Sequence, residues 1–463
     1  MRSVLYFEIM YPIYCELIEK NRGSGICIAF FEDIELYRLY PLVYARPTYE
    51  IRIGVFPLWF RAAAKLGAEY VVLFMRDYLA PYFDWFYRIY LNFNFVSVND
   101  VSKLDYPTTL LINGRLVVDN KALEVIRKVI ASTGNIVVVS RGYIAVAKLH
   151  PSLAITAAEF LKAPISPELL DFLSQTVEVL EEEELTFLNN LWEILLWNER
   201  YLAEDIELLK RELEWCRFEG KVKGNREKVL LHPRAQVDED VVIDVRRGPV
   251  LIDEGAEVNA FTYIEGPTYI GRFSKVGANT NLEHGTNIGP YSYVGGELKN
   301  VVVQGFTNKK HHGYLGDSYV CEWVNIGAGT VVSNLKNTYG AIKMYVGKVR
   351  VDTGVNKIGA FIGDWVKTAV NVTIYCGRKI GPAAHLYGSV YEDVPPFTIY
   401  ARDYGKPLIE LSLDEAIEIQ RRMKASRGML LTDHEVNIMK RIYEETASER
   451  ISKDVAKTKF TLP

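Results

Sequence analysis

A six-residue repeat is the feature that most constrains the fold of this chain. From about residue 232, an aliphatic side chain recurs at every sixth position. A small residue lies four positions after each of the first seven of these aliphatic residues. The aliphatic series is Ile252, Val258, Ile264, Ile270, Val276, Leu282, Ile288 and Val294, and the small series is Ala256, Thr262, Thr268, Ser274, Thr280, Thr286 and Ser292.

Such a repeat predicts short flat strands separated by tight corners, with three strands closing one triangular coil. Glycine follows the aliphatic residue at 271, 277, 289 and 295, where a corner favours a residue without Cβ. An ordinary β-sandwich would instead show alternation with period two and irregular turns. We therefore expect a left-handed parallel β-helix over residues 226–400.

The register breaks after Val294 and resumes at Val320, and we interpret the intervening residues as an insertion. The insertion contains "NKKHHGYLGD" (308–317), which holds two of the seven histidines in the chain. After Pro395 and Pro396 the repeat stops, and residues 401–463 are expected to form a helical tail. The tail would cap the open end of the coil or pack on a neighbouring subunit.

The first half has a different pattern, in which apolar strand-like runs alternate with amphipathic stretches. The runs include "GICIAFFED" (25–33), "EYVVLFM" (69–75) and "TTLLINGRLVV" (108–118). This alternation predicts an α/β domain over residues 1–165. Residues 166–225 have helical periodicity and are expected to be a helical connector between the two halves.

Composition and charge narrow the possible functions. The 463 residues are 49% hydrophobic and 24% charged, as in soluble globular proteins, and the net charge is −4. With no basic excess, nothing predicts a nucleic-acid or membrane-surface partner. Five scattered cysteines without a Cys-x-x-Cys pair indicate a reducing compartment and no zinc site, so we expect a cytoplasmic protein.

The second half resembles a specific family. The stretch "NKKHHGYLGDSYVCEWVNIGAGTVVSN" (308–334), with "IGPYSYVGGELKN" (288–300) before it, is similar to the acetyltransferase site of the bifunctional UDP-N-acetylglucosamine diphosphorylase/glucosamine-1-phosphate N-acetyltransferases. The resemblance covers roughly residues 232–400. It implies acetyl-coenzyme A as co-substrate and a homotrimer, because hexapeptide acyltransferases form their sites between adjacent coils of a trimer.

The chemistry of N-acetylation requires a base, because a sugar ammonium must lose a proton before it attacks a thioester. Histidine suits this task near neutral pH. By resemblance His311 is the catalytic base and Lys299, twelve residues earlier, holds the sugar phosphate. Tyr314, Asn325 and Asn334 match positions that contact the substrate or the base. His312 receives no role.

Each of these residues also has a plainer interpretation. A surface histidine pair need not be catalytic, Asn325 could belong to an asparagine ladder, and Lys299 could be an ordinary solvated lysine. The chain also departs from the family: no arginine precedes Lys299 at the expected place, and "SNLKN" replaces the usual Asn-Tyr-Asp. The identity of the amino sugar therefore stays open.

The first half lacks the Gly-Thr-Arg loop of typical sugar-1-phosphate nucleotidyltransferases. Its "LYPLVYARPTYEIRIGVFPLWFRAA" (39–63) resembles a divergent nucleotidyltransferase-like branch that is joined to the same β-helix. Arg46, Arg52 and Arg115 are candidate nucleotide-binding residues, because guanidinium groups clamp phosphates. They could equally pair with Glu50, Glu32 or Asp33. Mg²⁺ is expected for nucleotidyl transfer, but its ligands are unknown.

Taken together, the sequence predicts a transferase that makes a UDP-activated N-acetyl amino sugar. Its substrates would be an amino sugar 1-phosphate, acetyl-coenzyme A and a nucleoside triphosphate. One alternative is a sugar-1-phosphate nucleotidyltransferase whose β-helix only assembles a trimer. A second is a non-enzymatic scaffold that binds sugar nucleotides.

Overall fold

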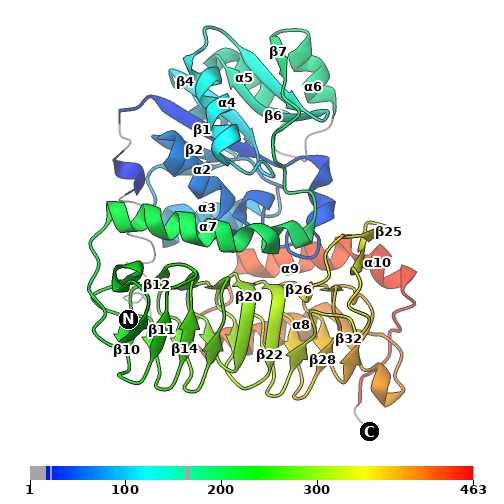
Figure 1. The fold of residues 1–463 in the computed structure, drawn as a ribbon. Helices are drawn as coiled ribbons and strands as arrows, with labels where there is room; N and C mark the ends of the chain where they lie inside the picture. Colours follow the sequence, from blue (N-terminus) through cyan, green and yellow to red (C-terminus); the bar gives the residue numbers. More distant parts are fainter. Residues whose placement is uncertain (1–16, 21–22, 162–166, 462–463) are drawn as a thin grey trace.

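The computed structural model describes residues 17–20, 23–161 and 167–461, and it has three parts (Figure 1). An α/β domain lies at one end, a long β-helix at the other, and helix α7 (Leu191–Glu212) runs between them. The C-terminal helices pack against the side of the β-helix.

The α/β domain is built on a seven-stranded sheet of order β3-β2-β1-β4-β6-β5-β7. Four neighbouring strands are parallel, and β6 is antiparallel to both β4 and β5. The strands are β1 (Ile26–Phe31), β2 (Tyr70–Leu73), β3 (Val96–Val98), β4 (Thr108–Asn113), β5 (Ile136–Ser140), β6 (Tyr143–Leu149) and β7 (Glu178–Glu181).

Both faces of this sheet are buried. Ile28 and Phe30 of β1 pack into one core, whereas Cys27, Ala29 and Phe31 pack into another. A strand that is covered on both faces becomes apolar throughout, which explains the run "ICIAFF". The covering helices are α2 (Leu58–Leu66), α3 (Ala80–Asp84), α4 (Asn120–Ala131), α5 (Pro151–Ala158) and α6 (Pro167–Ser174).

The predicted connector over residues 166–225 is only partly helical. Within it, β7 pairs in parallel with β5 and completes the sheet of the α/β domain. Its residues "EVLE" are exposed at the sheet edge, so they lack the apolar alternation that identifies most strands. The β-helix then begins at β8 (Lys221–Lys223), close to the expected position.

The β-helix has the predicted three-strand coil, because equivalent residues pair at a spacing of 18. Ile252 lies beside Ile270, and Ile270 lies beside Ile288. The aliphatic residues of the repeat are at most 1% exposed, and the small threonines and serines between them are at most 2% exposed. The predicted hexapeptide fold is therefore confirmed.

The strands form three faces. The first face contains β8, β11 (Val242–Asp244), β14 (Tyr263–Glu265), β17 (Asn281–Leu282), β23 (Val331–Val332), β28 (Thr373–Ile374) and β31 (Ser389–Val390). The second contains β9 (Val229–Leu231), β12 (Val250–Ile252), β15 (Thr268–Ile270), β18 (Thr286–Ile288), β26 (Ala360–Ile362) and β29 (Arg378–Ile380). The third contains β10 (Gln236–Val237), β13 (Glu257–Val258), β16 (Lys275–Val276), β19 (Tyr293–Val294), β21 (Asn308–Lys309), β27 (Lys367–Thr368), β30 (His385–Leu386) and β32 (Thr398–Tyr400).

Two longer strands, β20 (Glu297–Val303) and β22 (Tyr314–Val320), bend around the corner between the first and second faces. Residues 295–320 therefore continue the coil, and the interpretation of this stretch as an insertion was wrong. The coil is interrupted later, where the hairpin of β24 (Lys343–Val346) and β25 (Val349–Asp352) intervenes between β23 and β26.

The C-terminal tail closes the far end of the coil. Strand β33 (Ile409–Glu410) pairs antiparallel with β32, which covers the last exposed edge. Three helices follow, as the sequence predicts, namely α8 (Leu413–Ala425), α9 (Asp433–Glu445) and α10 (Ala447–Ser452). From the turn after α8, Arg427 Nη1 donates a hydrogen bond to the carbonyl oxygen of Phe306 on the β-helix at 2.8 Å.

Candidate active site

The register between β20 and β22 brings most of the predicted acetyltransferase residues to one region of the β-helix. Glu297 pairs with Tyr314, and Lys299 pairs with Gly316 on the next coil. Because paired residues in a parallel β-helix project from the same face, Lys299 and Tyr314 belong to one surface. His311 lies in the turn that leads into β22.

A network of side-chain hydrogen bonds fixes this surface. The amide nitrogen of Asn334 donates to the Tyr314 hydroxyl at 2.9 Å and to an Asp317 carboxylate oxygen at 2.6 Å. The other oxygen of Asp317 accepts a hydrogen bond from the Asn300 amide at 2.8 Å. Burial raises the pKa of Asp317 above its ordinary value and that of Tyr314 to about 12.

His311 and His312 are both exposed, but a buried side chain stabilises the turn that carries them. Lys309 is only 2% exposed, and its ammonium donates to the carbonyl oxygens of Gly295 at 2.8 Å and His311 at 2.7 Å. Burial lowers the pKa of Lys309 to about 8. The His311 imidazole has no hydrogen-bond partner among the described residues, so it is available to a ligand.

The sequence analysis missed Lys309, although the repeat offered a signal. Lys309 lies six residues after Val303 and six before Leu315, both of which are buried in the coil. It therefore occupies an inward position of the repeat that is usually aliphatic. The six-residue register was lost earlier, because this coil is shorter: Val294 pairs with Lys309 at a spacing of 15 residues and not 18.

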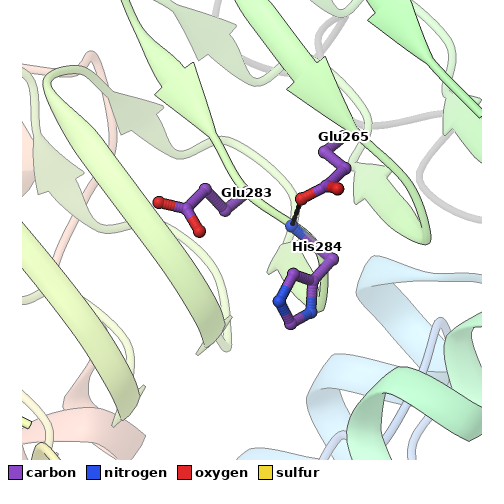
Figure 2. A group of neighbouring side chains, drawn as sticks. All are labelled: Glu265, Glu283 and His284. Carbon is purple, nitrogen blue, oxygen red and sulfur yellow. Dashed lines mark hydrogen bonds between the residues drawn. The ribbon is translucent and has the colours of Figure 1, made fainter. Parts of the chain in front are cut away.

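Lys299 is partly buried and forms an ion pair with Glu283 at 2.6 Å. Glu283 belongs to a group with Glu265 and His284 on adjacent coils, whose potential metal-binding atoms all lie within 4.8 Å of one another (Figure 2). Glu199 of α7 lies 3.2 Å from His284 Nδ1. Since Glu283 already neutralises Lys299, a sugar phosphate at Lys299 would have to displace or share that carboxylate.

Asn325 lies apart from the Tyr314 network. Its side-chain oxygen accepts a hydrogen bond from the Asn308 amide at 2.8 Å, and its backbone pairs with Asn308 and Lys367. The alternative that Asn325 belongs to a ladder therefore matches its contacts. Lys367 and His385 occupy the next paired positions on the following coils. Burial lowers the pKa of Lys367 to about 7 and that of His385 to about 4.

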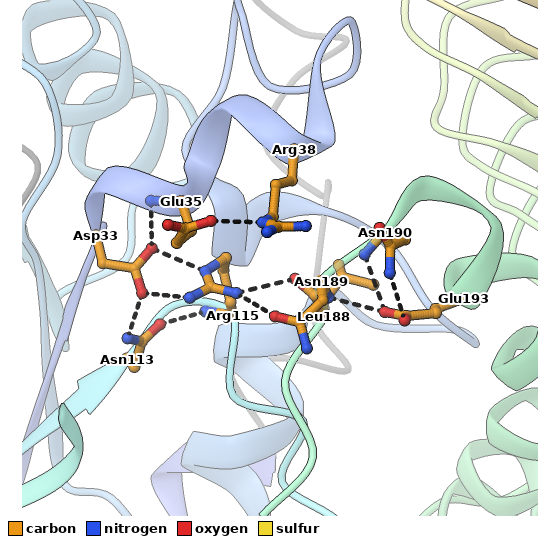
Figure 3. A network of polar contacts seen from close by, with 9 residues as sticks. All are labelled: Asp33, Glu35, Arg38, Asn113, Arg115, Leu188, Asn189, Asn190 and Glu193. Atoms are coloured by element: carbon orange, nitrogen blue, oxygen red, sulfur yellow. Dashed lines mark hydrogen bonds and ion pairs between the residues drawn. The ribbon is translucent and has the colours of Figure 1, made fainter. Parts of the chain in front are cut away.

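Arg115, one of the three candidate nucleotide-binding arginines, is buried in an internal ion pair. Arg115 is 0% exposed and binds both oxygens of Asp33 at 2.8 and 2.6 Å (Figure 3). The same guanidinium donates to the Asn189 side chain at 2.7 Å. The alternative that Arg115 pairs with Asp33 is thus the arrangement observed.

Arg46 and Arg52 connect the α/β domain to the β-helix. Arg46 forms an ion pair with Asp364 of the β-helix, and Arg52 donates through Nη1 to the Val55 carbonyl oxygen at 2.6 Å. The backbone N–H of Arg52 also donates to the Tyr319 hydroxyl at 3.2 Å. Both side chains are 4% exposed, so their polar groups are used largely within the protein.

The carboxyl ends of β1, β2 and β4 would be the expected ligand edge of such a sheet. Glu32 and Asp33, which follow β1, are the carboxylates nearest to this edge in sequence. However, Glu32 pairs with Arg76 at 3.0 Å and accepts the Thr48 N–H, while Asp33 is held by Arg115. Glu32 and Asp33 are therefore not free to bind Mg²⁺ in this arrangement.

Comparisons with known proteins agree with this architecture. Residues 28–214 match the family model described as "Sugar nucleotidyl transferase". This part of the chain is similar to sugar nucleotidyl transferases. The chain is also 39% identical over 161 residues to a bifunctional sugar-1-phosphate nucleotidylyltransferase/acetyltransferase from Sulfurisphaera tokodaii, covering 34% of this chain and 38% of that protein. The predicted family resemblance is thus confirmed.

Other relatives match shorter parts. The bifunctional protein GlmU of Methanocaldococcus jannaschii is 32% identical over 110 residues, which is 23% of this chain and 27% of that protein. A solved Francisella novicida UDP-N-acetylglucosamine acyltransferase aligns with 48% of this chain and 86% of that chain at 11% identity, and its TM-score of 0.26 adds no weight. The alignments with the curated relatives span less than two fifths of their lengths. Within the described residues, no helix has the length and apolar character needed to span a lipid bilayer.

Proposed function

We propose that this protein acetylates the amino group of an amino sugar 1-phosphate with acetyl-coenzyme A. The observation that supports this most is the hydrogen-bonded set of Tyr314, Asn334, Asp317 and Asn300, together with the exposed His311 in the turn that leads into the strand of Tyr314. The similarity to a protein named as a bifunctional nucleotidylyltransferase/acetyltransferase supports the same conclusion.

In the proposed reaction, the imidazole of His311 takes a proton from the sugar ammonium. The neutral amine then attacks the thioester carbonyl carbon and a C–N bond forms. The C–S bond breaks, and the nitrogen gives up its second proton to the leaving thiolate, so that the products are the amide and the free thiol of coenzyme A. Lys299 binds the sugar phosphate, and Tyr314 and Asn334 orient the substrate. We include the homotrimer and a cytoplasmic location in the proposal.

Nucleotidyl transfer is a second candidate, which the family match over residues 28–214 favours. It would join UTP and the N-acetyl sugar 1-phosphate, with release of pyrophosphate. Such transfer needs divalent metal and phosphate-binding cations. In the arrangement described above, Arg46 and Arg115 are committed to Asp364 and Asp33, so this activity requires those pairs to open.

The direct test incubates the full chain with acetyl-coenzyme A and either glucosamine 1-phosphate or galactosamine 1-phosphate, and follows free thiol together with the N-acetylated product. We expect thiol and product to appear in equal amounts with at least one sugar. Lys299→Met should raise the KM for the sugar phosphate more than it lowers kcat, whereas Lys440→Met, at an exposed lysine on α9, should change neither.

Absence of acetylation with both sugars would contradict the primary proposal. Pyrophosphate release from UTP and an N-acetyl sugar 1-phosphate is measured separately, because the two activities are predicted on different domains. Light scattering of the purified protein tests the trimer: a mass near 53 kDa would contradict it, given the chain mass of 52.8 kDa.

A further inference from the structure

A group of potential metal ligands lies where α7 meets the β-helix. Ile264 of β14 pairs with Leu282 of β17, so Glu265 and Glu283, which follow them, lie side by side on adjacent coils. His284 comes next along the chain. The potential metal-binding atoms of these three side chains all lie within 4.8 Å of one another, and the two carboxylates lie on either side of His284 (Figure 2). A single cation can therefore contact all three.

Two of these three side chains are not committed to other contacts. Glu265 forms no ion pair within the described ranges, and its carboxylate only accepts the backbone N–H of His284 at 3.4 Å. The Nε2 atom of His284 has no hydrogen-bond partner in the part of the chain that the structure describes. Carboxylate oxygens and imidazole nitrogens are common metal ligands. Both groups therefore keep a lone pair for a cation.

Glu199 of α7 orients the imidazole ring. Its Oε2 atom lies 3.2 Å from Nδ1 of His284, and this hydrogen bond lowers the pKa of Glu199, so the carboxylate is ionised and accepts the Nδ1 proton. The lone pair of the neutral ring is then on Nε2. Metal-bound histidines almost always donate their other ring N–H to a carboxylate, a carbonyl or water. The contact with Glu199 is therefore a second observation that indicates a metal on Nε2.

Glu283 is shared with the residue proposed to bind the sugar phosphate. Its Oε2 accepts a hydrogen bond from the Lys299 ammonium at 2.6 Å. The two side chains are 25% and 27% exposed, and ion pairs with this much exposure are weak. At the same distance a divalent cation attracts a carboxylate about twice as strongly as an ammonium does. A cation bound by Glu265 and His284 would therefore compete with Lys299 for Glu283.

The charges around the group favour a cation over an anion. Glu199, Glu265 and Glu283 contribute three negative charges. Lys299 pairs with Glu283, and Arg247 lies 3.3 Å from Glu199, so two positive charges oppose them and one negative charge is in excess. One nitrogen and two oxygen ligands favour a first-row transition metal such as Zn²⁺ or Mn²⁺ over Mg²⁺ and Ca²⁺, which prefer oxygen alone.

We propose that Glu265, Glu283 and His284 bind a divalent transition-metal cation, and that this cation draws Glu283 away from Lys299. The freed ammonium then binds the phosphate of the amino sugar, a consequence that rests on the proposed function. Because coupling between two binding sites is reciprocal, bound sugar phosphate also strengthens metal binding. The metal thus controls the affinity for the substrate and takes no part in the acetyl transfer itself.

The first test measures metal binding to the full chain, prepared without a polyhistidine tag, by isothermal titration calorimetry. Zn²⁺ and Mn²⁺ are the probes, and excess Mg²⁺ is present throughout. We expect Zn²⁺ to bind more tightly than Mn²⁺. His284→Ala should weaken the binding of both by about tenfold or more. Glu265→Gln should weaken it as well, and it decides the test if His284→Ala fails to fold. His150→Ala, at an exposed histidine of the α/β domain, is the control and should change nothing.

The second test asks whether Lys299 and the metal compete for Glu283. Lys299→Met removes the competitor and should strengthen metal binding roughly two- to fivefold, which is the range expected from loss of an exposed ion pair. Lys440→Met, at an exposed lysine on α9, should not. In a Glu283→Gln background, Lys299→Met should have little effect, because the shared carboxylate is gone. This test does not depend on acetyl transfer.

The third test is the acetyl-transfer assay with and without Mn²⁺, since Zn²⁺ binds the thiol product. Mn²⁺ should lower the KM for the amino sugar 1-phosphate in the parent protein and leave it unchanged in His284→Ala.

Each part of the proposal has its own contrary result. Absence of metal binding, or equal affinity in the parent and in both His284→Ala and Glu265→Gln, would overturn the metal site. Unchanged metal affinity in Lys299→Met, or a KM that Mn²⁺ does not alter, would overturn the link to Lys299. Metal binding without any acetyl transfer would contradict the proposed function but not the metal site, so the two conclusions fail separately.

Discussion

The ammonium group of Lys309 donates a hydrogen bond to the carbonyl oxygen of His311 over 2.7 Å, from a side chain that is 2% exposed. A charged group inside a coil of aliphatic residues is unfavourable unless its hydrogen bonds are satisfied. Here they connect the interior of the coil to the turn that carries the proposed base. Lys309 is therefore a positioning residue for His311.

Lys309→Met tests this role, because methionine fills a similar volume without the donor. We expect kcat for acetyl transfer to fall about tenfold, which is about 1.4 kcal/mol in the barrier. The melting temperature should change little, since the lost hydrogen bonds are offset by removal of a buried charge. The measurement is kcat and Tm on the same preparation.

Lys310→Met is the matched control, because Lys310 is the exposed neighbour and should keep full activity. Equal activity in Lys309→Met and Lys310→Met would show that the buried ammonium does not position His311.

Asn334→Asp should make acetyl transfer sensitive to pH. The substitution replaces the amide that donates to Asp317 at 2.6 Å with a second carboxyl group. Two carboxyl groups so close share a proton at low pH and repel each other once both ionise. We expect the rate relative to the parent to fall as pH rises from 6 to 8.

Steady-state assays from pH 6 to pH 8 measure the ratio of the variant's rate to the parent's rate. Asn337→Asp, on the exposed insertion, should show a ratio that does not depend on pH. A constant ratio for Asn334→Asp would mean that the network does not bear on catalysis.

The repeat predicts the β-helix from sequence because each coil uses the same inward aliphatic residue, so periodicity reports the fold directly. Strand β7 was not predicted, because its two apolar residues, Val179 and Leu180, are adjacent and exposed between two glutamates at the sheet edge. The role of Lys309 was not predicted either, because the coil before it is shortened: Val294 pairs with Lys309 at a spacing of 15 residues, so the inward positions no longer fall at every sixth residue.

The candidate site was predictable in part. The structure joins Tyr314 to Asn334 by a hydrogen bond and Asn325 to Asn308 by another, whereas the substrate-binding roles that the resemblance implies for these residues stay predictions. The arginines show why residue type alone misleads. The partner of Arg46 is Asp364, which lies 318 positions away along the chain, and no local pattern indicates such a pair.

The buried pair of Arg115 and Asp33 is expected to be structural. Arg115→Met leaves the Asp33 carboxylate buried without its cation and should lower the free energy of unfolding by roughly 3–5 kcal/mol. Asp33→Asn together with Arg115→Met should cost much less than the sum of the single changes. Urea denaturation of the three variants measures the coupling, and additive effects would contradict it.

Glu322 should make stability depend on pH. Burial raises its pKa in the folded protein to about 7, whereas the unfolded carboxyl titrates near 4.5. Between these values the folded state binds more protons, so the free energy of unfolding should fall as pH rises and then level off above pH 7.

Because the Glu322 side chain is 26% exposed, we expect a fall on the order of 1–2 kcal/mol. Glu322→Gln should remove that part of the slope, as measured by urea denaturation at pH 5 and pH 8. If the free energy of unfolding changed by the same amount between pH 5 and pH 8 in the parent and in Glu322→Gln, the assignment to Glu322 would be refuted.

In the proposed reaction His311, and not its neighbour His312, is the base for acetyl transfer. The measurement is the release of free thiol from acetyl-coenzyme A with an amino sugar 1-phosphate by His311→Ala and His312→Ala, side by side. We predict that His311→Ala loses at least a hundredfold in kcat, as expected for loss of a general base, while His312→Ala stays within a few-fold of the parent. Full activity of His311→Ala, or an equal loss in both variants, would contradict this account.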